Sequence, residues 1–514
     1  MAGTAPPRPH PPAFLTAQPV LAAWLLLGAM TTLPYVAAAV SPPPGRTFVG
    51  TFHWIDDFYN YVSFVQQAED GRFLFKNKLR LEDHPPALVN LEWWTVGTLS
   101  RICGRRPFLA YRLFALAVLG GFLWAVDRTL RRGGLPPSHR LLALVFVGTA
   151  GGLGGLLFEL TPRPVFRSAD LASGIFPFKE ILANPHWLAG TWLLLETLLA
   201  FDGAASFRGA LRPAALGTVL GLVRPYDLVM VVLVRVLSVP FLGPRSEWRG
   251  RLLPVLGLVP VVLYNYWVFY AIPTFSTYAG TRYYAPPASD MLWALGPAGL
   301  AALAALRPRD GNEATRAALI PLWTWSVLAL VATLLRPVAF AQQFVIGAGL
   351  PLLLLASLGA ARARPWVLGV MAASFCTTAI VALRIVWQSD PNWHVAAERR
   401  EAALALRPHC RPGEIAFSPE DIGLYTIGLT SCNAFLSHSW APDHSERQAL
   451  VRAFYAEMPA EERAALLRRF QVTKLVLPGD AGPSPGAWLG EGTDFARVAL
   501  LGPPPGTLSV YVRR

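Results

Sequence analysis

Residues 51–90 read TFHWIDDFYNYVSFVQQAEDGRFLFKNKLRLEDHPPALVN and hold the densest mixture of acidic, basic and aromatic side chains in the chain. The first long apolar segment, residues 14–40, ends shortly before them. The stretch contains the adjacent carboxylates Asp56 and Asp57. Leaving a charged group unpaired at a bilayer costs free energy, so a carboxylate pair there usually has a binding partner or a function. We therefore expect the other spans to surround this polar loop.

The composition around this loop is that of a membrane protein. Of the 514 residues, 53% are hydrophobic and 15% are charged, whereas soluble domains carry about 25% charged residues. The formal net charge is +13, which in a soluble protein would suggest nucleic acid as a partner. Here the Arg residues mostly lie between apolar segments, so membrane topology explains them better and no nucleic-acid partner is expected.

Apolar segments of membrane-spanning length recur through the first three quarters of the chain. They are residues 14–40, 107–127, 141–160, 180–201, 212–243, 252–272, 290–306, 317–335, 338–360 and 366–388. The segment 212–243 is too long for one ordinary span and is interrupted from Arg224 to Asp227, so we predict two short helices that meet there. The sequence predicts an α-helical polytopic membrane protein with about eleven transmembrane helices.

The distribution of Arg residues predicts the orientation and the domains. Arg is concentrated in the loops that face the cytoplasm if the N-terminus is cytoplasmic. Residues 1–13 then form a disordered cytoplasmic tail, and residues 14–388 form the transmembrane domain with an outer loop at 41–106. Residues 389–514 are charged and contain the strand-like segments EIAFS and KLVLP, which predict a small α/β domain on the outer face. Cys410 and Cys432 both fall in it and are candidates for a disulfide, which the sequence leaves open.

The outer loop has the side chains for one kind of group transfer. A carboxylate such as Asp56 or Asp57 can take a proton from an acceptor hydroxyl or amine, while cations stabilise a departing phosphate. The candidate cations are Lys76, His84, Arg224 and Arg336. The alternative is that the two aspartates simply cap the helix that follows, and spacing alone does not separate the two readings.

Four motifs resemble the GT-C glycosyltransferases, particularly the family 39-like enzymes that include protein O-mannosyltransferases and the aminoarabinose transferase of lipid A. Asp56 and Asp57 match the acidic pair of the first outer loop in that family. The turn at His84, Pro85 and Pro86 matches a Pro-Pro turn in which Lys is common in place of His. The other two matches are GLVRPYD at 221–227 and RPVAFAQQFVIGAGLPLLLL at 336–355.

The resemblance implies a function and a set of roles. The enzyme would transfer a hexosyl or pentosyl group from a polyprenyl-phosphate donor to a lipid, glycan or protein acceptor, in the plasma membrane of a bacterium. Asp56 would act as base with Asp57 in support. Arg224 and His84 would contact the phosphate, with Lys76 and Arg336 as weaker candidates. Paired aspartates can also ligate a divalent metal, and the sequence does not decide whether one is needed.

Two other readings compete with a transferase. One is a transporter or flippase of a lipid-linked or small polar substrate, with the charged outer loop as its gate. The other is a non-catalytic assembly protein whose exported domain binds a partner.

Overall fold

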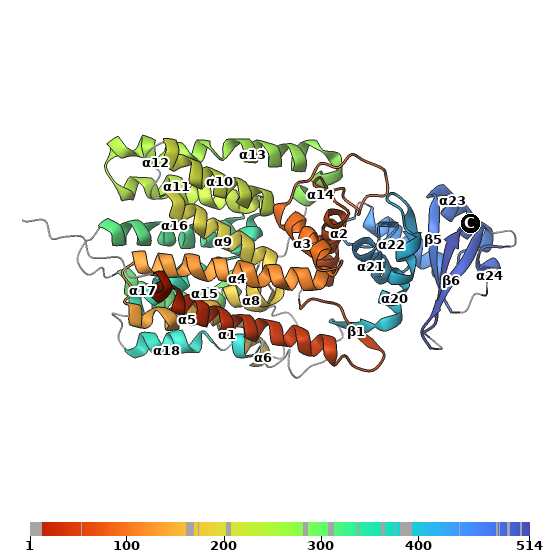
Figure 1. Cartoon of the computed structure of the whole chain (residues 1–514), viewed down its shortest axis with the longest axis horizontal. Coiled ribbons are helices and arrows are strands. Elements are labelled where there is room, and N and C mark those ends of the chain that lie inside the picture. The colour runs from red at the N-terminus through yellow and green to blue at the C-terminus, as the bar shows by residue number, and fades with distance from the viewer. Residues whose placement is uncertain are drawn as a thin grey trace, which may run out of the picture.

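The structure is a computed structural model that describes residues 13–52, 54–160, 169–172, 174–201, 207–280, 286–306, 313–336, 338, 340–360, 365–375, 377–380, 393–441, 443–479, 482, 484–490, 494–503 and 506–514. Figure 1 shows an elongated molecule with a bundle of helices at one end, short helices in the middle and a sheet at the other end. Residues 1–12 of the predicted cytoplasmic tail and residues 381–388 of the last predicted span lie outside the described residues.

The bundle is built from helices of the first three quarters of the chain. They are α1 (Ala13–Val40), α4 (Pro107–Arg132), η1 (Pro137–His139), α5 (Arg140–Thr149), α6 (Gly154–Leu160), α7 (Ala169–Ala172), α8 (Pro177–Ala183), α9 (Pro185–Ala200), α10 (Phe207–Val223), α11 (Tyr226–Leu242), η3 (Arg245–Glu247), α12 (Trp248–Leu256), α13 (Val259–Tyr266), η4 (Trp267–Ala271), α14 (Pro273–Gly280), α15 (Ala288–Ala302), η5 (Leu303–Leu306), α16 (Glu313–Leu335), η6 (Ala341–Val345), α17 (Gly349–Ala360) and α18 (Pro365–Ala373).

Several of these helices suit a bilayer. Within the described residues, five are long and apolar enough to cross a membrane, and a sixth results if the pair Arg245–Leu256 and Val259–Ala271, bent by 42°, is one span. Large apolar side chains such as Leu25, Leu33 and Leu142 point outward from the bundle, which is favourable where lipid replaces water. The protein is therefore mostly helical and membrane-embedded, while the count of eleven spans stays a prediction.

The predicted break in the segment 212–243 is present. Helix α10 ends at Val223 and α11 begins at Tyr226, so Arg224 and Pro225 form the link between two helices of 17 residues each. Proline has no N–H to continue the hydrogen-bond ladder of α10, but it fits the N-terminal end of the next helix. The break places the Arg224 side chain at the end of the bundle that faces the outer loop.

The outer loop forms a layer on this end of the bundle. It consists of β1 (Arg46–Phe48), α2 (Ile55–Glu69) and α3 (Leu91–Ile102). Helices α2 and α3 pack closely at Gly97, where an added Cβ would lie only 2.3 Å from the Cβ of Ala68 and 2.6 Å from the carbonyl oxygen of Val65. Only glycine allows this approach.

The C-terminal part carries a mixed sheet with helices. Its elements are β2 (His394–Ala396), α20 (Ala397–Leu406), η7 (Arg407–His409), β3 (Ile415–Phe417), α21 (Glu420–Leu429), β4 (Asn433–Ala434), α22 (His444–Ala456), α23 (Ala460–Arg469), β5 (Val472–Pro478), α24 (Gly486–Leu489), β6 (Phe495–Leu501) and β7 (Leu508–Arg513).

The sheet has the order β4-β3-β5-β7-β6. Strand β3 runs parallel to β4 and β5, and β7 runs antiparallel to β5 and β6. The strands β3 and β5 lie where the sequence suggests them, and their core includes Phe417, Phe435 and Phe454. A disulfide joins Cys410 to Cys432. The domain boundaries at residues 13 and 388 stay predictions.

The C-terminal part rests directly on the outer loop. Strand β2 pairs antiparallel with β1, and helix α21 packs against α2, with the rings of Tyr59 and Tyr425 4.9 Å apart. The buried ammonium of Lys78 donates to the carbonyl oxygens of Ile427 at 3.0 Å and Thr430 at 2.6 Å. These contacts hold residues 437–440 against the N-terminal end of α2.

Candidate active site

The acidic pair begins helix α2. Asp56 and Asp57 lie in its first turn, whereas the N-cap residue is Trp54, whose side chain makes no capping hydrogen bond. The backbone N–H groups at a helix N-terminus favour nearby negative charge. The geometry thus gives the aspartates a favourable field without using either of them as the cap, and leaves their carboxylates for other contacts.

Both carboxylates line a cavity of about 420 Å³ between the outer loop, the bundle and the C-terminal part. The α10–α11 break, the start of α9 and η6 form its membrane side, and residues 438–440 close it from the C-terminal side. Its polar lining residues include Asp56, Asp57, Asn60, Tyr61, Asn90, His186, Arg224, Asn265, Tyr278, Gln342, Gln343 and His438. One cavity therefore joins segments from the whole length of the chain.

Asp57 is held by His438. The Nε2 atom of His438 lies 3.3 Å from Oδ1 of Asp57, and the backbone N–H of Trp440 donates to Nδ1 at 2.9 Å. Because Nδ1 accepts this bond, the imidazole proton sits on Nε2 and is donated to Asp57. The buried His438 side chain therefore orients the carboxylate of Asp57.

Asp56 has a different environment. Its side chain is exposed and lines both this cavity and a second one behind it. The surrounding protein still desolvates the carboxyl enough to raise its pKa, and the charges of Asp57 and Glu420 act in the same direction while His438 acts against them. A carboxylate with a raised pKa that solutes can reach has the properties of a general base.

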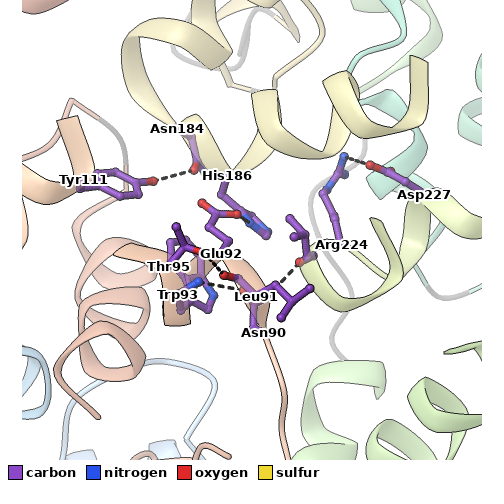
Figure 2. A network of polar contacts seen from close by, with 11 residues as sticks. Asn90, Leu91, Glu92, Trp93, Thr95, Tyr111, Asn184, His186, Arg224 and Asp227 are labelled. Carbon is purple, nitrogen blue, oxygen red and sulfur yellow. Dashed lines mark hydrogen bonds and ion pairs between the residues drawn. The ribbon is translucent and has the colours of Figure 1, made fainter. Parts of the chain in front are cut away.

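Arg224 supplies the cationic side of the cavity. Its guanidinium donates to Oδ2 of Asp227 at 2.9 Å and to the carbonyl oxygen of Gln343 at 3.0 Å, and the side chain is only 2% exposed. Figure 2 shows the Arg224–Asp227 pair at the α10–α11 break, with the ribbon of the bundle around it. A fixed, planar donor set of this kind suits a phosphate oxygen.

A second buried pair lies beside Arg224. Oε2 of Glu92 is 2.7 Å from Nδ1 of His186, and Figure 2 shows the two side chains facing each other. Glu92 is fully buried at its side chain, whereas His186 is 14% exposed and lines the cavity. The Glu92 carboxylate accepts a hydrogen bond from Nδ1–H of His186 and so fixes the orientation of the ring.

Aromatic rings complete the wall. Tyr61 stacks on Trp93 with centroids 4.6 Å apart, and the Nδ2 group of Asn60 donates to the hydroxyl of Tyr278 at 3.3 Å. Trp440 packs edge-on against Tyr278. Rigid rings with polar tips make a cavity that offers both apolar faces and hydrogen bonds.

The structure thus brings three of the six predicted site residues together: Asp56, Asp57 and Arg224. His84 does not line the cavity, because its ring nitrogens lie 3.0 Å and 3.1 Å from the carbonyl oxygens of Pro85 and Asn77. Lys76 is paired with Asp83, and Arg336 is exposed. The Pro-Pro turn folds His84 back onto its own loop.

Sequence reasoning did not assign His438, His186 or Glu92 to the site. His438 is separated from Asp57 by 381 positions, and no spacing pattern links residues so far apart. The available signal for His186 was its place after Asn184 and Pro185 at the start of a span, which an interfacial histidine explains equally well. Within the described residues, no group of three or more His, Cys, Asp or Glu side chains could share a metal ion.

Comparison with protein-family models and with curated proteins finds no match. Comparison with solved structures finds several over almost the whole chain. The arabinofuranosyltransferase AftD from Mycobacteria is 16% identical with a TM-score of 0.54 over 98% of this chain, which spans only 40% of the AftD chain. The oligosaccharyltransferase AglB from Archaeoglobus fulgidus, solved with an inhibitory peptide and a dolichol-phosphate, is 10% identical with a TM-score of 0.56, covering 98% of this chain and 74% of AglB.

ArnT from Cupriavidus metallidurans matches over nearly its full length. In the apo state it is 12% identical with a TM-score of 0.55, covering 96% of this chain and 98% of ArnT, and it has also been solved with undecaprenyl phosphate bound. All three are GT-C glycosyltransferases. The chain therefore has the fold of the GT-C class of membrane glycosyltransferases.

Proposed function

We propose that the protein transfers a sugar from a polyprenyl-phosphate donor to an acceptor on the outer face of the membrane. The observation that carries this proposal is the 420 Å³ cavity, in which Asp56 and Asp57 face Arg224 and His186. An acid–base group and a cationic phosphate site are the two parts that such a transfer needs. The fold shared with AglB and ArnT, which have been solved with dolichol-phosphate and undecaprenyl phosphate, supports the same class of donor.

An apolar groove supports a lipid-linked donor. A groove of about 480 Å³ between α11 and the α12–α13 segment shares Pro225, Tyr226, Asn265 and Phe269 with the cavity. The rest of its lining is almost entirely Leu, Val, Tyr and Phe. A polyprenyl chain in this groove would place its phosphate at the α10–α11 break, next to Arg224.

The proposed reaction is a displacement at the anomeric carbon. The acceptor hydroxyl or amine forms a bond to C1 of the sugar and gives its proton to Asp56. The bond between C1 and the phosphate oxygen breaks, and its electron pair stays on the departing polyprenyl phosphate. Arg224 and His186 stabilise the charge on that phosphate, because donors fixed in a dry site need little reorganisation.

The two aspartates take separate roles in this proposal. Asp56 acts as the base because its carboxylate is exposed to the cavity and has a raised pKa. Asp57, fixed by His438, positions the acceptor or the sugar. Phosphate contacts by His84, Lys76 and Arg336, and a divalent metal at the aspartates, stay predictions.

The orientation is proposed on chemical grounds. The disulfide between Cys410 and Cys432 is of the kind that persists in oxidising compartments. The C-terminal part and the active-site cavity are then periplasmic or extracellular, with the N-terminus in the cytoplasm, as in a bacterial plasma-membrane protein.

The test is sugar transfer in membranes that contain the wild type, Asp56→Asn or the matched control Asp70→Asn. Radiolabelled sugars on polyprenyl phosphates serve as donors. We expect transfer by the wild type, a loss of at least about a hundredfold in Asp56→Asn, and near-normal transfer in Asp70→Asn, whose carboxylate lies at the far end of α2. Equal activity of Asp56→Asn and wild type would refute the assignment of the base. Absence of transfer from every donor by folded protein would favour the transporter reading.

A further inference from the structure

A second cavity lies behind Asp56. It measures about 810 Å³ and is lined by residues of β1, β2, α20 and α21 and by Ser437. None of its lining residues belongs to a helix of the bundle. Asp56 lines both this cavity and the 420 Å³ cavity, so the carboxylate stands between a space that borders the membrane and a space that does not.

The lining of the second cavity includes side chains of both charges. Arg46 and Arg399 supply donors, and Glu420 and Asp421 supply acceptors in addition to Asp56. Arg399 forms an ion pair with Asp421, and Arg46 donates to the carbonyl oxygen of His394 at 2.7 Å. These contacts hold the charged groups in fixed positions along the wall.

Among the described residues, two buried side chains of this wall contain polar atoms that are not hydrogen-bonded. His394 is 5% exposed and Ser437 is 3% exposed. In the part of the chain that the structure describes, the ring nitrogens of His394 and the Oγ atom of Ser437 have no hydrogen-bond partner. Buried polar groups are normally paired, so these unpaired atoms leave hydrogen-bonding capacity in the wall of the cavity.

This chemistry matches a carbohydrate. A sugar hydroxyl both donates and accepts hydrogen bonds, so a wall of interleaved guanidinium, carboxylate, imidazole and hydroxyl groups can pair with many hydroxyls at once. A lipid chain would need an apolar wall like that of the α11–α13 groove. An acidic glycan would meet the carboxylates of Asp56, Glu420 and Asp421 at close range, which like-charge repulsion disfavours.

We propose that the second cavity binds the acceptor, and that the acceptor is a neutral oligosaccharide. The proposal rests on the proposed glycosyltransferase function and names its acceptor class. The acceptor hydroxyl reaches Asp56 from the second cavity while the donor sugar lies in the first. Its oxygen bonds to C1 of the donor sugar, its proton passes to Asp56, and polyprenyl phosphate departs with the electron pair of the broken C1–O bond.

The test measures binding without turnover. The full-length Asp56→Asn protein, purified in nanodiscs, is titrated calorimetrically with soluble neutral oligosaccharides of hexoses and of pentoses. We expect at least one to bind, and we expect Arg399→Gln in the same background to weaken that binding about tenfold, because a charged hydrogen-bond donor is lost. Ser437→Ala, which removes one hydroxyl without adding bulk, should weaken it several-fold.

A matched control distinguishes a specific effect on binding in the second cavity from the general effect of losing an ion pair. Arg251→Gln removes the arginine of the ion pair between Arg251 of α12 and Glu247 of η3, in the helical bundle, and should leave oligosaccharide affinity unchanged. Undecaprenyl phosphate affinity should be the same in all variants. Thermal unfolding of each variant checks that the fold is retained.

The outcomes distinguish this inference from the proposed function. Sugar transfer to a peptide or a lipid, without binding of any neutral oligosaccharide, would overturn the acceptor class while the transferase assignment stands. Oligosaccharide binding that is insensitive to both Arg399→Gln and Ser437→Ala would overturn the placement of the site. Binding that both variants weaken, without transfer from any polyprenyl donor, would support the carbohydrate site and refute the transferase instead.

Discussion

Asp56 and Asp57 are identical in type and adjacent in sequence, yet their surroundings give them different chemistry. The imidazole of His438 donates to Asp57, which fixes the direction of the carboxylate. Asp56 remains exposed to two cavities, and burial still raises its pKa. Pairs of carboxylates with such different surroundings are common in sites where one carboxylate transfers a proton and the other positions the substrate.

The pH dependence of activity follows from this arrangement. Asp56 must be ionised to accept a proton, so activity should fall as the pH is lowered through its pKa, which lies above the usual value for Asp. The charge of Asp57 contributes to that rise. In Asp57→Asn we therefore expect the acid limb of the pH–rate profile to move to lower pH, together with a loss of about tenfold at the optimum.

The profile should be measured with saturating donor, for wild type, Asp57→Asn and Asp70→Asn. Asp70 is not among the groups that shift the pKa of Asp56, so its replacement should leave the limb in place. An acid limb that stays fixed, or moves to higher pH, in Asp57→Asn would show that Asp56 is not the titrating base.

His438 should act as a positioning residue. His438→Leu removes the hydrogen bond to Asp57, and we expect kcat to fall about ten- to a hundredfold with the KM for the donor unchanged. His438→Gln keeps an N–H donor near the position of Nε2 and should recover part of that loss. The exposed His409 of η7 gives the control His409→Leu. Equal losses in the Leu and Gln variants would indicate a packing role instead.

At the scale of single residues, sequence reasoning reached the acidic pair and Arg224 but not their partners. Asp56, Asp57 and Arg224 stand out because charge is conspicuous in apolar surroundings. His84 was assigned through its match to the Pro-Pro turn of the family, yet its ring nitrogens lie against carbonyl oxygens of its own loop. His438 lies in a polar region of the sequence, where a histidine does not by itself indicate a functional site. The packing of the C-terminal part against α2 brings it to the cavity.

Helices α2 and α21 are joined by a buried cation. The ammonium of Lys78 donates to Gln66 on α2 at 2.7 Å and to the carbonyls of Ile427 and Thr430 at the C-terminal end of α21. A cation is favourable at a helix C-terminus. Burial nevertheless lowers the pKa of Lys78 to about 7, because the protein interior solvates charge poorly.

This depressed pKa makes stability depend on pH. The unfolded chain keeps Lys78 protonated up to its ordinary pKa of about 10.4, so between pH 7 and that value the unfolded state binds more protons than the folded one. Stability from this group therefore rises with pH through that window, by at most about 1.4 kcal/mol per pH unit, and is flat below it. In Lys78→Met, this contribution to the dependence of stability on pH should be absent.

Apparent melting temperatures from pH 6 to pH 10 measure this effect as the difference between wild type and variant. Lys76→Met is the control, because Lys76 lies in the same loop and pairs with the exposed Asp83, so its difference curve should be flat. A flat difference curve for Lys78→Met as well would mean that Lys78 keeps its ordinary pKa in the folded protein.

The elements themselves were predictable where local rules decide them. The α10–α11 break follows from Pro225, and strands β3 and β5 follow from short apolar runs between turns. The pairing of β1 with β2 was not predictable, because three-residue strands so far apart carry no register signal. The close packing of α2 on α3 at Gly97 likewise depends on tertiary contacts.

The whole molecule places its two proposed substrates on opposite sides of one carboxylate. The apolar groove lies along α11 in the helical bundle, and the second cavity lies between the outer loop and the C-terminal part. A donor and an acceptor that enter by separate routes need not displace each other. Changes in either route should then affect the KM of one substrate only.

The donor route offers a closely matched pair of substitutions on α11. Val229 lines the groove and is 39% exposed, whereas Val236 lies two turns further along, is 41% exposed and does not line it. Val229→Trp fills part of the groove, so we expect the KM for the polyprenyl-phosphate donor to rise about tenfold while the KM for the acceptor is unchanged. A tenfold change, about 1.4 kcal/mol, corresponds to about two buried methylenes of the lipid losing their contact.

Val236→Trp adds the same bulk at a lipid-facing position outside the groove and should leave both KM values near those of the wild type. Both constants are measured in the same nanodisc preparation, so that changes in insertion or folding appear as a common loss of active protein. If the two tryptophan variants raise the donor KM equally, the lipid chain does not lie in this groove. The donor would then reach Arg224 by another path through the bundle.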